Sequence, residues 1–126
     1  MEFNEEQCRA YLEKIRWSGH PKCPYCESIN STPVPKEARY HCNNCFTSYS
    51  VTVGTLFHCT RVPLNKWFKA IALNLQPDGE ISIRELARLI DVNKNTAASM
   101  IARIQISKRE DEALLRSINN FWTRSK

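Results

Sequence analysis

Two cysteine pairs decide the fold of this chain, Cys23-Pro24-Tyr25-Cys26 and Cys42-Asn43-Asn44-Cys45, with 15 residues between them. Two thiolates three positions apart on a turn can bind one ion from the same side, and a second such turn completes a tetrahedron. The proline stiffens the first turn, and the asparagine pair suits a turn in the second. The doubled spacing therefore predicts one structural Zn²⁺ ion, with four ligands: Cys23, Cys26, Cys42 and Cys45.

Four thiolates at Zn–S distances of ~2.3 Å leave no place for water, so such a site is structural and not hydrolytic. The alternative interpretation is two unrelated pairs of redox-active or buried cysteines. Cys8 lies on the apolar stripe of a predicted helix, where a free cysteine acts as a small hydrophobe. Cys59 follows His58, but with no matching pair an unligated thiol is favoured over a second metal site. His20 and His41 flank the pairs and are not needed as ligands.

Composition and length restrict the class of protein. The chain has 126 residues, of which 42% are hydrophobic and 25% charged, which excludes wholesale disorder and a collagen-like chain. This length allows one ordinary domain or two very small ones. No apolar run approaches the ~20 residues of a membrane span, and the acidic N-terminus MEFNEEQ is unlike a signal peptide. We therefore expect a soluble, cytoplasmic protein.

The N-terminal half alternates between one helix and short extended pieces. Residues 3–17 are predicted to form a helix that Asn4 caps together with Gln7. From residue 22 to about residue 57 the pattern becomes extended, with alternation over residues 39–42 and an aromatic, β-branched run over residues 46–53. We expect a β-hairpin around the second cysteine pair, with the metal supplying most of the folding free energy of this small ribbon.

Three helices are predicted to follow. Pro63 opens the first, which the turn at residues 77–79 ends. A capping box at Ser82 and Glu85 starts the second, and the third begins near Lys94 after a break at residues 91–93. The inward positions recur at helical spacing: Leu64, Trp67, Phe68, Ile71, Ala72 and Leu75, then Leu86, Leu89 and Ile90, then Ala97, Met100, Ile101 and Ile104.

Two short helices joined by a tight turn, with a longer helix across them, make a helix-turn-helix unit. The expected fold class is therefore small α+β, a four-cysteine zinc ribbon followed by a trihelical helix-turn-helix domain. Its segments are an N-terminal helix (1–21), the ribbon (22–60), the helix-turn-helix domain (61–106) and a C-terminal helical tail (107–126).

The third helix is the candidate reader of the DNA major groove. Its outward positions are Lys94, Asn95, Ser99 and Arg103. Arginine can bind guanine through two hydrogen bonds, asparagine can pair with adenine, and lysine and serine suit phosphates. The alternative interpretation is an ordinary three-helix bundle whose polar face is only solvated.

Charge supports a polyanionic partner weakly. The chain has 18 Lys and Arg residues against 13 Asp and Glu residues, a formal net charge of +5. Residues 22–69 hold six basic and two acidic residues, so the excess lies on the ribbon and the helix that follows it. Arg39, Lys66 and Lys69 are therefore predicted to contact the phosphate backbone of double-stranded DNA, although a solvated surface would have the same composition.

The end of the chain carries an apolar stripe at helical spacing, formed by Leu114, Leu115, Ile118, Phe121 and Trp122. Such a stripe must be buried somewhere. Packing on the chain's own core is the favoured interpretation. Docking onto a protein partner or a second copy of the chain is the alternative.

The order of these pieces resembles a known family. The cysteine ribbon runs into Ser50-Val51-Thr52-Val53-Gly54-Thr55-Leu56-Phe57-His58 and then Pro63-Leu64-Asn65-Lys66-Trp67-Phe68, with Leu86-Ala87-Arg88 and Thr96-Ala97 farther on. Over residues 10–106 this is similar to the N-terminal part of insertion-sequence transposases that carry a zinc ribbon before a helix-turn-helix. The resemblance implies zinc at the four cysteines and recognition of transposon-end DNA by the helix that starts at Lys94. In the family a ribonuclease H-like catalytic domain with acidic metal ligands follows.

The sequence departs from this family in several places. Only 20 residues follow residue 106, where a catalytic domain needs on the order of 100 or more. Ala98 and Ser99 stand where an aromatic pair is common, and Asp91 and Glu27 stand where glycine is usual. The acidic run at residues 110–112 lies on one helix surface and not on converging elements.

We therefore expect a sequence-specific DNA-binding protein that is not an enzyme and is associated with the nucleoid. Its expected role is that of a transcriptional regulator or a transposon-end binder. The alternative is a zinc-ribbon adaptor or accessory subunit that docks onto transcription machinery or a nucleoprotein complex.

Overall fold

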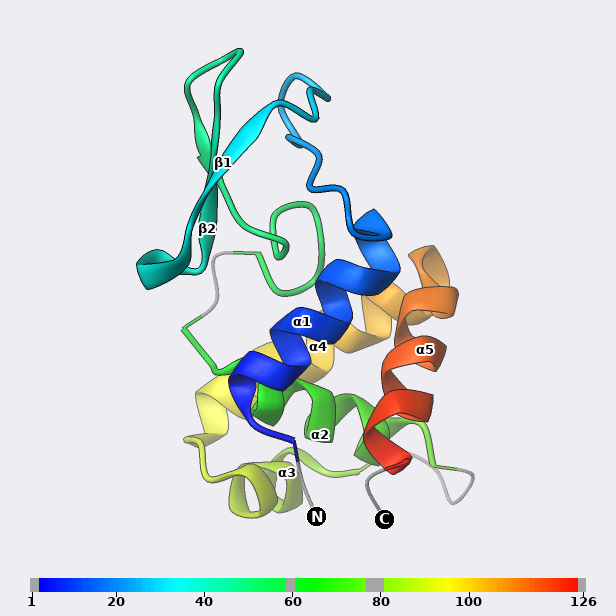
Figure 1. The fold of residues 1–126 in the computed structure, drawn as a ribbon. Coiled ribbons are helices and arrows are strands. Elements are labelled where there is room, and N and C mark those ends of the chain that lie inside the picture. Colours follow the sequence, from blue (N-terminus) through cyan, green and yellow to red (C-terminus); the bar gives the residue numbers. More distant parts are fainter. Residues whose placement is uncertain (1–2, 59–60, 77–80, 125–126) are drawn as a thin grey trace. The chain divides into compact units, whose positions relative to one another are not determined.

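The computed structural model describes residues 3–58, 61–76 and 81–124 (Figure 1). The described residues fall into two compact units, one within residues 9–60 and the other within residues 1–8 and 61–126. We call them the ribbon unit and the helical unit. No helix in the described part of the chain is long and apolar enough to cross a membrane.

Helix α1 (Glu5–Trp17) begins at the predicted capping box. The Asn4 side chain accepts a hydrogen bond from the Gln7 amide at 2.8 Å, and the Asn4 amide donates to the Gln7 side chain at 2.9 Å. The helix stops where Ser18 and Gly19 take left-handed backbone angles, with φ of 50° and 89°. The first residues of α1 belong to the helical unit and the rest to the ribbon unit.

The ribbon unit contains a three-stranded antiparallel sheet in the order β1 (Ser31–Val34), β2 (Arg39–Cys42), β3 (Ser48–Tyr49). A 3₁₀ turn, η1 (Pro35–Glu37), joins β1 to β2, which lie side by side in Figure 1. The register places Tyr40 opposite Tyr49 and His41 opposite Ser48. The predicted hairpin around the second cysteine pair is therefore present.

The extended run expected over residues 46–53 is wrong in its extent, because only Ser48 and Tyr49 pair as a strand. Beyond them the chain turns, with the Val53 amide donating to the Ser50 carbonyl at 3.3 Å. The Arg16 guanidinium donates to the carbonyls of Val51 at 2.6 Å and Val53 at 3.1 Å. These contacts take the place of a continued strand ladder, and β-branched composition alone could not reveal them.

Helix α2 (Leu64–Asn74) follows Pro63, which lies just before its first helical residue. Five of the six predicted inward positions are buried and Leu75 is half-buried. Two unexpected residues, Ala70 and Asn74, are buried as well. The predicted end of the helix at residues 77–79 lies outside the described residues.

Helices α3 (Ile83–Ile90) and α4 (Lys94–Glu110) have the predicted caps. Ser82 accepts from the Glu85 amide at 3.1 Å, and Asn93 accepts from the Thr96 amide at 2.8 Å. The core side is formed by Leu86, Ala87, Ile90, Ala97, Met100 and Ile104, while Leu89 and Ile101 are half-buried.

Helix α4 continues through the boundary expected between residues 106 and 107. Ser107 is buried, and the Lys108 ammonium donates to the Asn74 carbonyl at the end of α2, at 3.4 Å. The mixed-sign run after Ser107 therefore extends the helix instead of starting a separate tail.

Helix α5 (Glu112–Thr123) packs on α2, and the two lie side by side in Figure 1. Leu115, Ile118 and Trp122 are buried. The Phe121 ring stacks on Phe3 with ring centroids 4.2 Å apart and meets Phe68 edge-on at 5.9 Å. Three of the five residues of the C-terminal apolar stripe are thus buried in the chain's own core, as the favoured interpretation predicted, and the other two, Leu114 and Phe121, are half-buried.

Candidate metal centre

The four predicted ligands lie together in the ribbon unit. Their sulfur atoms are all within 4.8 Å of one another. The two shortest separations join the pairs across the site, Cys23 to Cys45 at 3.7 Å and Cys26 to Cys42 at 3.5 Å. A tetrahedron with Zn–S bonds of ~2.3 Å has sulfur atoms about 3.8 Å apart. The donor set and its spacing therefore fit a structural zinc ion held by four thiolates.

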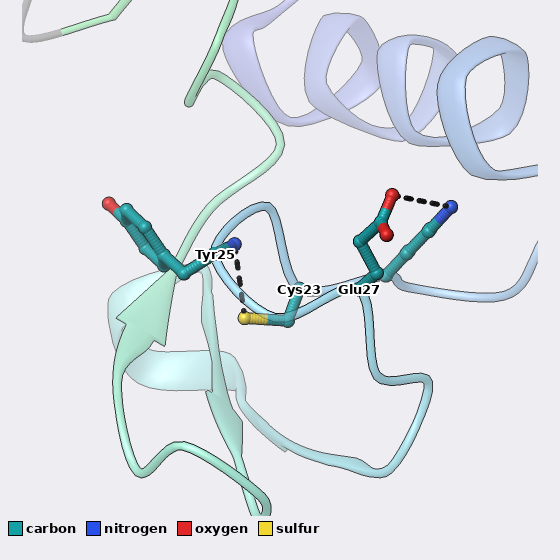
Figure 2. A network of polar contacts seen from close by, with 4 residues as sticks. Cys23, Tyr25 and Glu27 are labelled. Atoms are coloured by element: carbon teal, nitrogen blue, oxygen red, sulfur yellow. Dashed lines mark hydrogen bonds and ion pairs between the residues drawn. The ribbon is translucent and has the colours of Figure 1, made fainter.

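Each cysteine pair forms a turn in which one backbone amide donates to the sulfur of the first cysteine, from a position two residues later in the first pair and three residues later in the second. The Tyr25 amide donates to the Cys23 sulfur at 3.4 Å (Figure 2), and the Cys45 amide donates to the Cys42 sulfur at 3.5 Å. The residue after each pair closes the turn: the Glu27 amide donates to the Cys23 carbonyl at 2.9 Å, and the Phe46 amide to the Cys42 carbonyl at 3.0 Å. The two turns thus hold all four sulfurs close together, and in each pair one backbone amide donates to a sulfur.

The residue that closes each turn has a left-handed backbone. Glu27 has φ of 65° and Phe46 has φ of 62°. Only glycine adopts this region without strain, which explains why glycine is usual at the position of Glu27. The Glu27 carboxylate forms an exposed ion pair with Lys22 at 3.7 Å, drawn in Figure 2. Sequence reasoning missed Phe46, although it stands at the same place after the second pair as Glu27 does after the first.

Aromatic side chains pack against the buried cysteines of the centre. Cys23, Cys42 and Tyr49 are fully buried. Tyr49 stacks on Tyr40 with ring centroids 5.8 Å apart, and Trp17 meets both tyrosines edge-on. The Tyr49 hydroxyl also hydrogen-bonds the Ser31 hydroxyl at 2.7 Å. The aromatic rings of this small cluster come from the end of α1 and from the sheet, and the cluster also contains metal-site cysteines. The metal centre is therefore part of the ribbon's hydrophobic core.

The surroundings favour thiolates at some of the four cysteines. The side chain and backbone of Thr47 lower the pKa of Cys45 to about 6. Backbone hydrogen bonding from Cys45 lowers the pKa of Cys42. Ser28 favours the Cys26 thiolate through its backbone, but the neighbouring thiols and burial outweigh it and raise the pKa of Cys26 to about 12. Four adjacent negative charges repel one another, and a divalent cation removes that repulsion.

Comparison with known proteins supports the assignment of a zinc site to these cysteines. Residues 3–48 match the family model of the transposase zinc-ribbon domain. This part of the chain is similar to transposase zinc ribbons. The resemblance expected from the sequence is therefore confirmed, and with it the structural zinc site at the four cysteines.

One curated relative extends the similarity beyond the zinc ribbon. It is an uncharacterized protein in transposable element ISH50 of Halobacterium salinarum, 30% identical over 103 residues, which cover 79% of this chain and 34% of the relative. The chain thus spans about a third of the length of this relative. No solved structure matches significantly.

Among the described residues, the fifth cysteine, Cys8, and the three histidines do not join the zinc ribbon's metal site. In the described residues, the four cysteines form the one group of three or more His, Cys, Asp or Glu side chains close enough to share an ion. Cys8 is fully buried, and burial raises its pKa to about 12, as expected for a small unreactive hydrophobe. The His41 ring lies 6.4 Å from the Phe46 ring, and His20 is exposed. Cys59 lies outside the described residues.

The predicted DNA-contacting residues are distributed over both units. Lys94, Asn95 and Ser99 are exposed on the first turns of α4, and Arg103 is half-buried one turn beyond Ser99. Lys69 is half-buried on α2.

Lys66 and Arg39, which were also predicted to contact DNA, donate hydrogen bonds to carbonyls of the chain. The Lys66 ammonium donates to the Asp91 carbonyl at 2.9 Å, in the turn between α3 and α4. The Arg39 guanidinium, on the zinc ribbon, donates to the Ser48 carbonyl at 3.3 Å. Nothing in the sequence pattern indicated the bond from Lys66, because 25 residues separate it from Asp91.

Proposed function

We propose that this chain binds double-stranded DNA sequence-specifically, as a transposon-end binder or a transcriptional regulator on the nucleoid. One observation carries the proposal: α3 and α4 are joined by a three-residue turn, and α4 buries one side while exposing Lys94, Asn95 and Ser99 on the other. We interpret α2, α3 and α4 as a helix-turn-helix domain. The similarity of residues 3–48 to transposase zinc ribbons supports a role on DNA.

The turn before α4 supports this interpretation. Asp91 has φ of 57°, and the Val92 amide donates to the Ala87 carbonyl at 3.0 Å, which ends α3 abruptly. Asn93 then caps α4. Side chains on the first turns of α4 are exposed, and recognition helices contact base edges with their N-terminal residues. In this proposal Asn95 and Arg103 contact bases, while Lys94, Ser99 and Lys69 contact phosphates.

We further propose that the chain does not itself cut or join DNA. The acidic residues at the junction of α4 and α5 are exposed, and Glu112 is paired with Arg116 on its own helix. Strand transfer requires carboxylates that converge on catalytic metal ions from separate elements. Incubating the zinc-loaded chain with its bound DNA and Mg²⁺ should leave the DNA strands intact, and cleaved or joined strands would contradict this part of the proposal.

The experiment for DNA recognition starts from selection of duplexes from a random pool by the zinc-loaded chain. Asn95→Ala and Arg103→Ala should each weaken binding to the selected site about tenfold, by the ~1–3 kcal/mol of a base contact, and relax the preference at single positions. Lys94→Ala should weaken binding to all duplexes and reduce the salt dependence by about one counterion. Fluorescence anisotropy over a range of salt concentrations measures both effects.

Arg116→Ala is the matched control, because it removes an exposed arginine from α5 that the proposal does not use. It should leave affinity and sequence preference unchanged. If the chain selects no sequence, or the α4 variants bind like Arg116→Ala, the DNA-reading role of α4 is wrong. Capture of a polymerase or nucleoprotein complex without specific DNA would then favour the adaptor or accessory subunit.

A further inference from the structure

The two faces of the ribbon sheet differ in chemistry. Residues directly opposite each other, and residues two apart along a strand, share a face. Tyr40, Tyr49 and Cys42 therefore point to the inner face, where they pack with Trp17 and the metal centre. By the same register the outer face carries the other set of side chains: Thr32, Val34, Arg39, His41 and Ser48.

Phe46 adds an aromatic ring to the outer face. Its ring lies 6.4 Å from the ring of His41, which belongs to that face. The Phe46 side chain is 75% exposed, the most exposed of the chain's large hydrophobic residues in the described regions. Its backbone also has φ of 62°, a conformation that a bulky residue adopts only under strain. Neither burial nor backbone preference accounts for a phenylalanine here.

The charge of the outer face favours an anionic partner. Arg39 is held on the outer face by its hydrogen bond to the Ser48 carbonyl at 3.3 Å. None of the side chains of that face is acidic, and Thr32 and Ser48 are hydroxyl-bearing and exposed. A fixed cation, an exposed ring and hydroxyl groups are the combination that binds a phosphodiester chain with accessible bases.

We propose that the outer face of the ribbon sheet binds single-stranded DNA. An unpaired base stacks on Phe46 next to His41, and Arg39 contacts the adjoining phosphate. This surface is formed by residues of the ribbon unit, whereas the duplex-reading surface proposed for α4 is formed by residues of the helical unit. A protein that acts at transposon ends would then read paired DNA with one unit and unpaired DNA with the other.

The test uses the zinc-loaded chain and a fluorescein-labelled, mixed-sequence single strand of roughly ten nucleotides, a length typical of one small binding module. Phe46→Gly removes the ring and places glycine where glycine is unstrained. It should therefore weaken binding of the single strand about tenfold, in line with the loss of one stacked base, while the unfolding temperature stays the same or rises. A loss of binding from misfolding would instead lower that temperature.

Glu27→Gly is the matched control, since it makes the same backbone change at the same place after the first cysteine pair. It should not weaken binding of the single strand. Arg39→Gln should weaken binding and reduce its salt dependence by about 0.7 counterions. Lys94→Ala should leave binding of the single strand unchanged, so failure of this proposal and failure of duplex reading by α4 are distinguishable.

Three outcomes would overturn the proposal. The first is unchanged binding of the single strand by Phe46→Gly. The second is an equal loss of affinity for a fully paired duplex, which would make the outer face part of the duplex interface. The third is no binding of single strands by the unmodified chain, in which case the exposed ring would have to serve a protein partner.

Discussion

Glu27 and Phe46 have the same left-handed backbone conformation at equivalent places, directly after the first and the second cysteine pair. Each amide must reach back to the carbonyl of the first cysteine of its pair, and only a left-handed residue at that point lets the chain leave the turn. A non-glycine residue in this region carries roughly 1–2 kcal/mol of strain. Glu27 gains only an exposed ion pair in return, worth about 0–1 kcal/mol.

Replacing Glu27 should therefore stabilise the ribbon. Glu27→Gly relieves the strain but adds chain entropy to the unfolded state, about 0.5–1 kcal/mol for glycine, so the net gain in the free energy of unfolding should be about 0.5 kcal/mol. Denaturant unfolding of the zinc-loaded protein measures it. Glu37→Gly, in the exposed 3₁₀ turn without a left-handed backbone, is the control and should destabilise the protein.

At the scale of the elements, the junction of α3 and α4 shows which features could be predicted from the sequence and which could not. Ser82, Glu85 and Asn93 identify both helix starts, because each cap is a bond between residues three positions apart. The same locality made the zinc ligands predictable from spacing alone. Contacts between distant residues were not predictable, since they depend on how elements pack. The bond from Lys66 to the turn and the contacts of Arg16 with carbonyls beyond β3 are both of this kind.

Lys66 should stabilise the turn between α3 and α4 and should not contact DNA phosphates. Lys66→Met removes the donor to the Asp91 carbonyl and should lower the free energy of unfolding by ~1 kcal/mol, whereas Lys66→Arg should recover part of it. Lys36→Met, an exposed lysine of the ribbon, is the control for lost charge. The salt dependence of duplex binding decides the role: a fall of about one counterion in Lys66→Met would mean a phosphate contact after all.

At the scale of the whole molecule, the two units have different sources of stability. The helical unit has its own apolar core, which includes Trp67, Phe68, Met100, Ile104 and Ile118. The ribbon unit has a short sheet and a small aromatic cluster around its cysteines. A ribbon of that size buries too little to fold without a cross-link or a metal, so zinc should control one unit and leave the other folded.

Removing zinc should therefore unfold the protein in part. In Cys42→Ser, or after chelation, amide protection should be lost within β1, β2 and β3 and kept in α2 to α5, as hydrogen exchange would measure. Acid should unfold the ribbon unit as chelation does, because protons compete with Zn²⁺ for the thiolates. The affinity for zinc therefore decreases as the pH is lowered. Cys8→Ala changes a buried cysteine that is not a ligand, so it should still bind about one zinc per chain. Simultaneous loss of protection in both units would refute independent stability.

The shortness of β3 has a consequence for self-association. A sheet edge with a long row of unpaired amides and carbonyls recruits strands from other molecules. Here β3 is two residues long, and the carbonyls of Val51 and Val53 beyond it already accept hydrogen bonds from Arg16. On the opposite edge, Pro33 within β1 has no amide to donate. The ribbon sheet can therefore expose the Phe46 ring on one face, while its edges have few free backbone groups with which strands of other copies could pair.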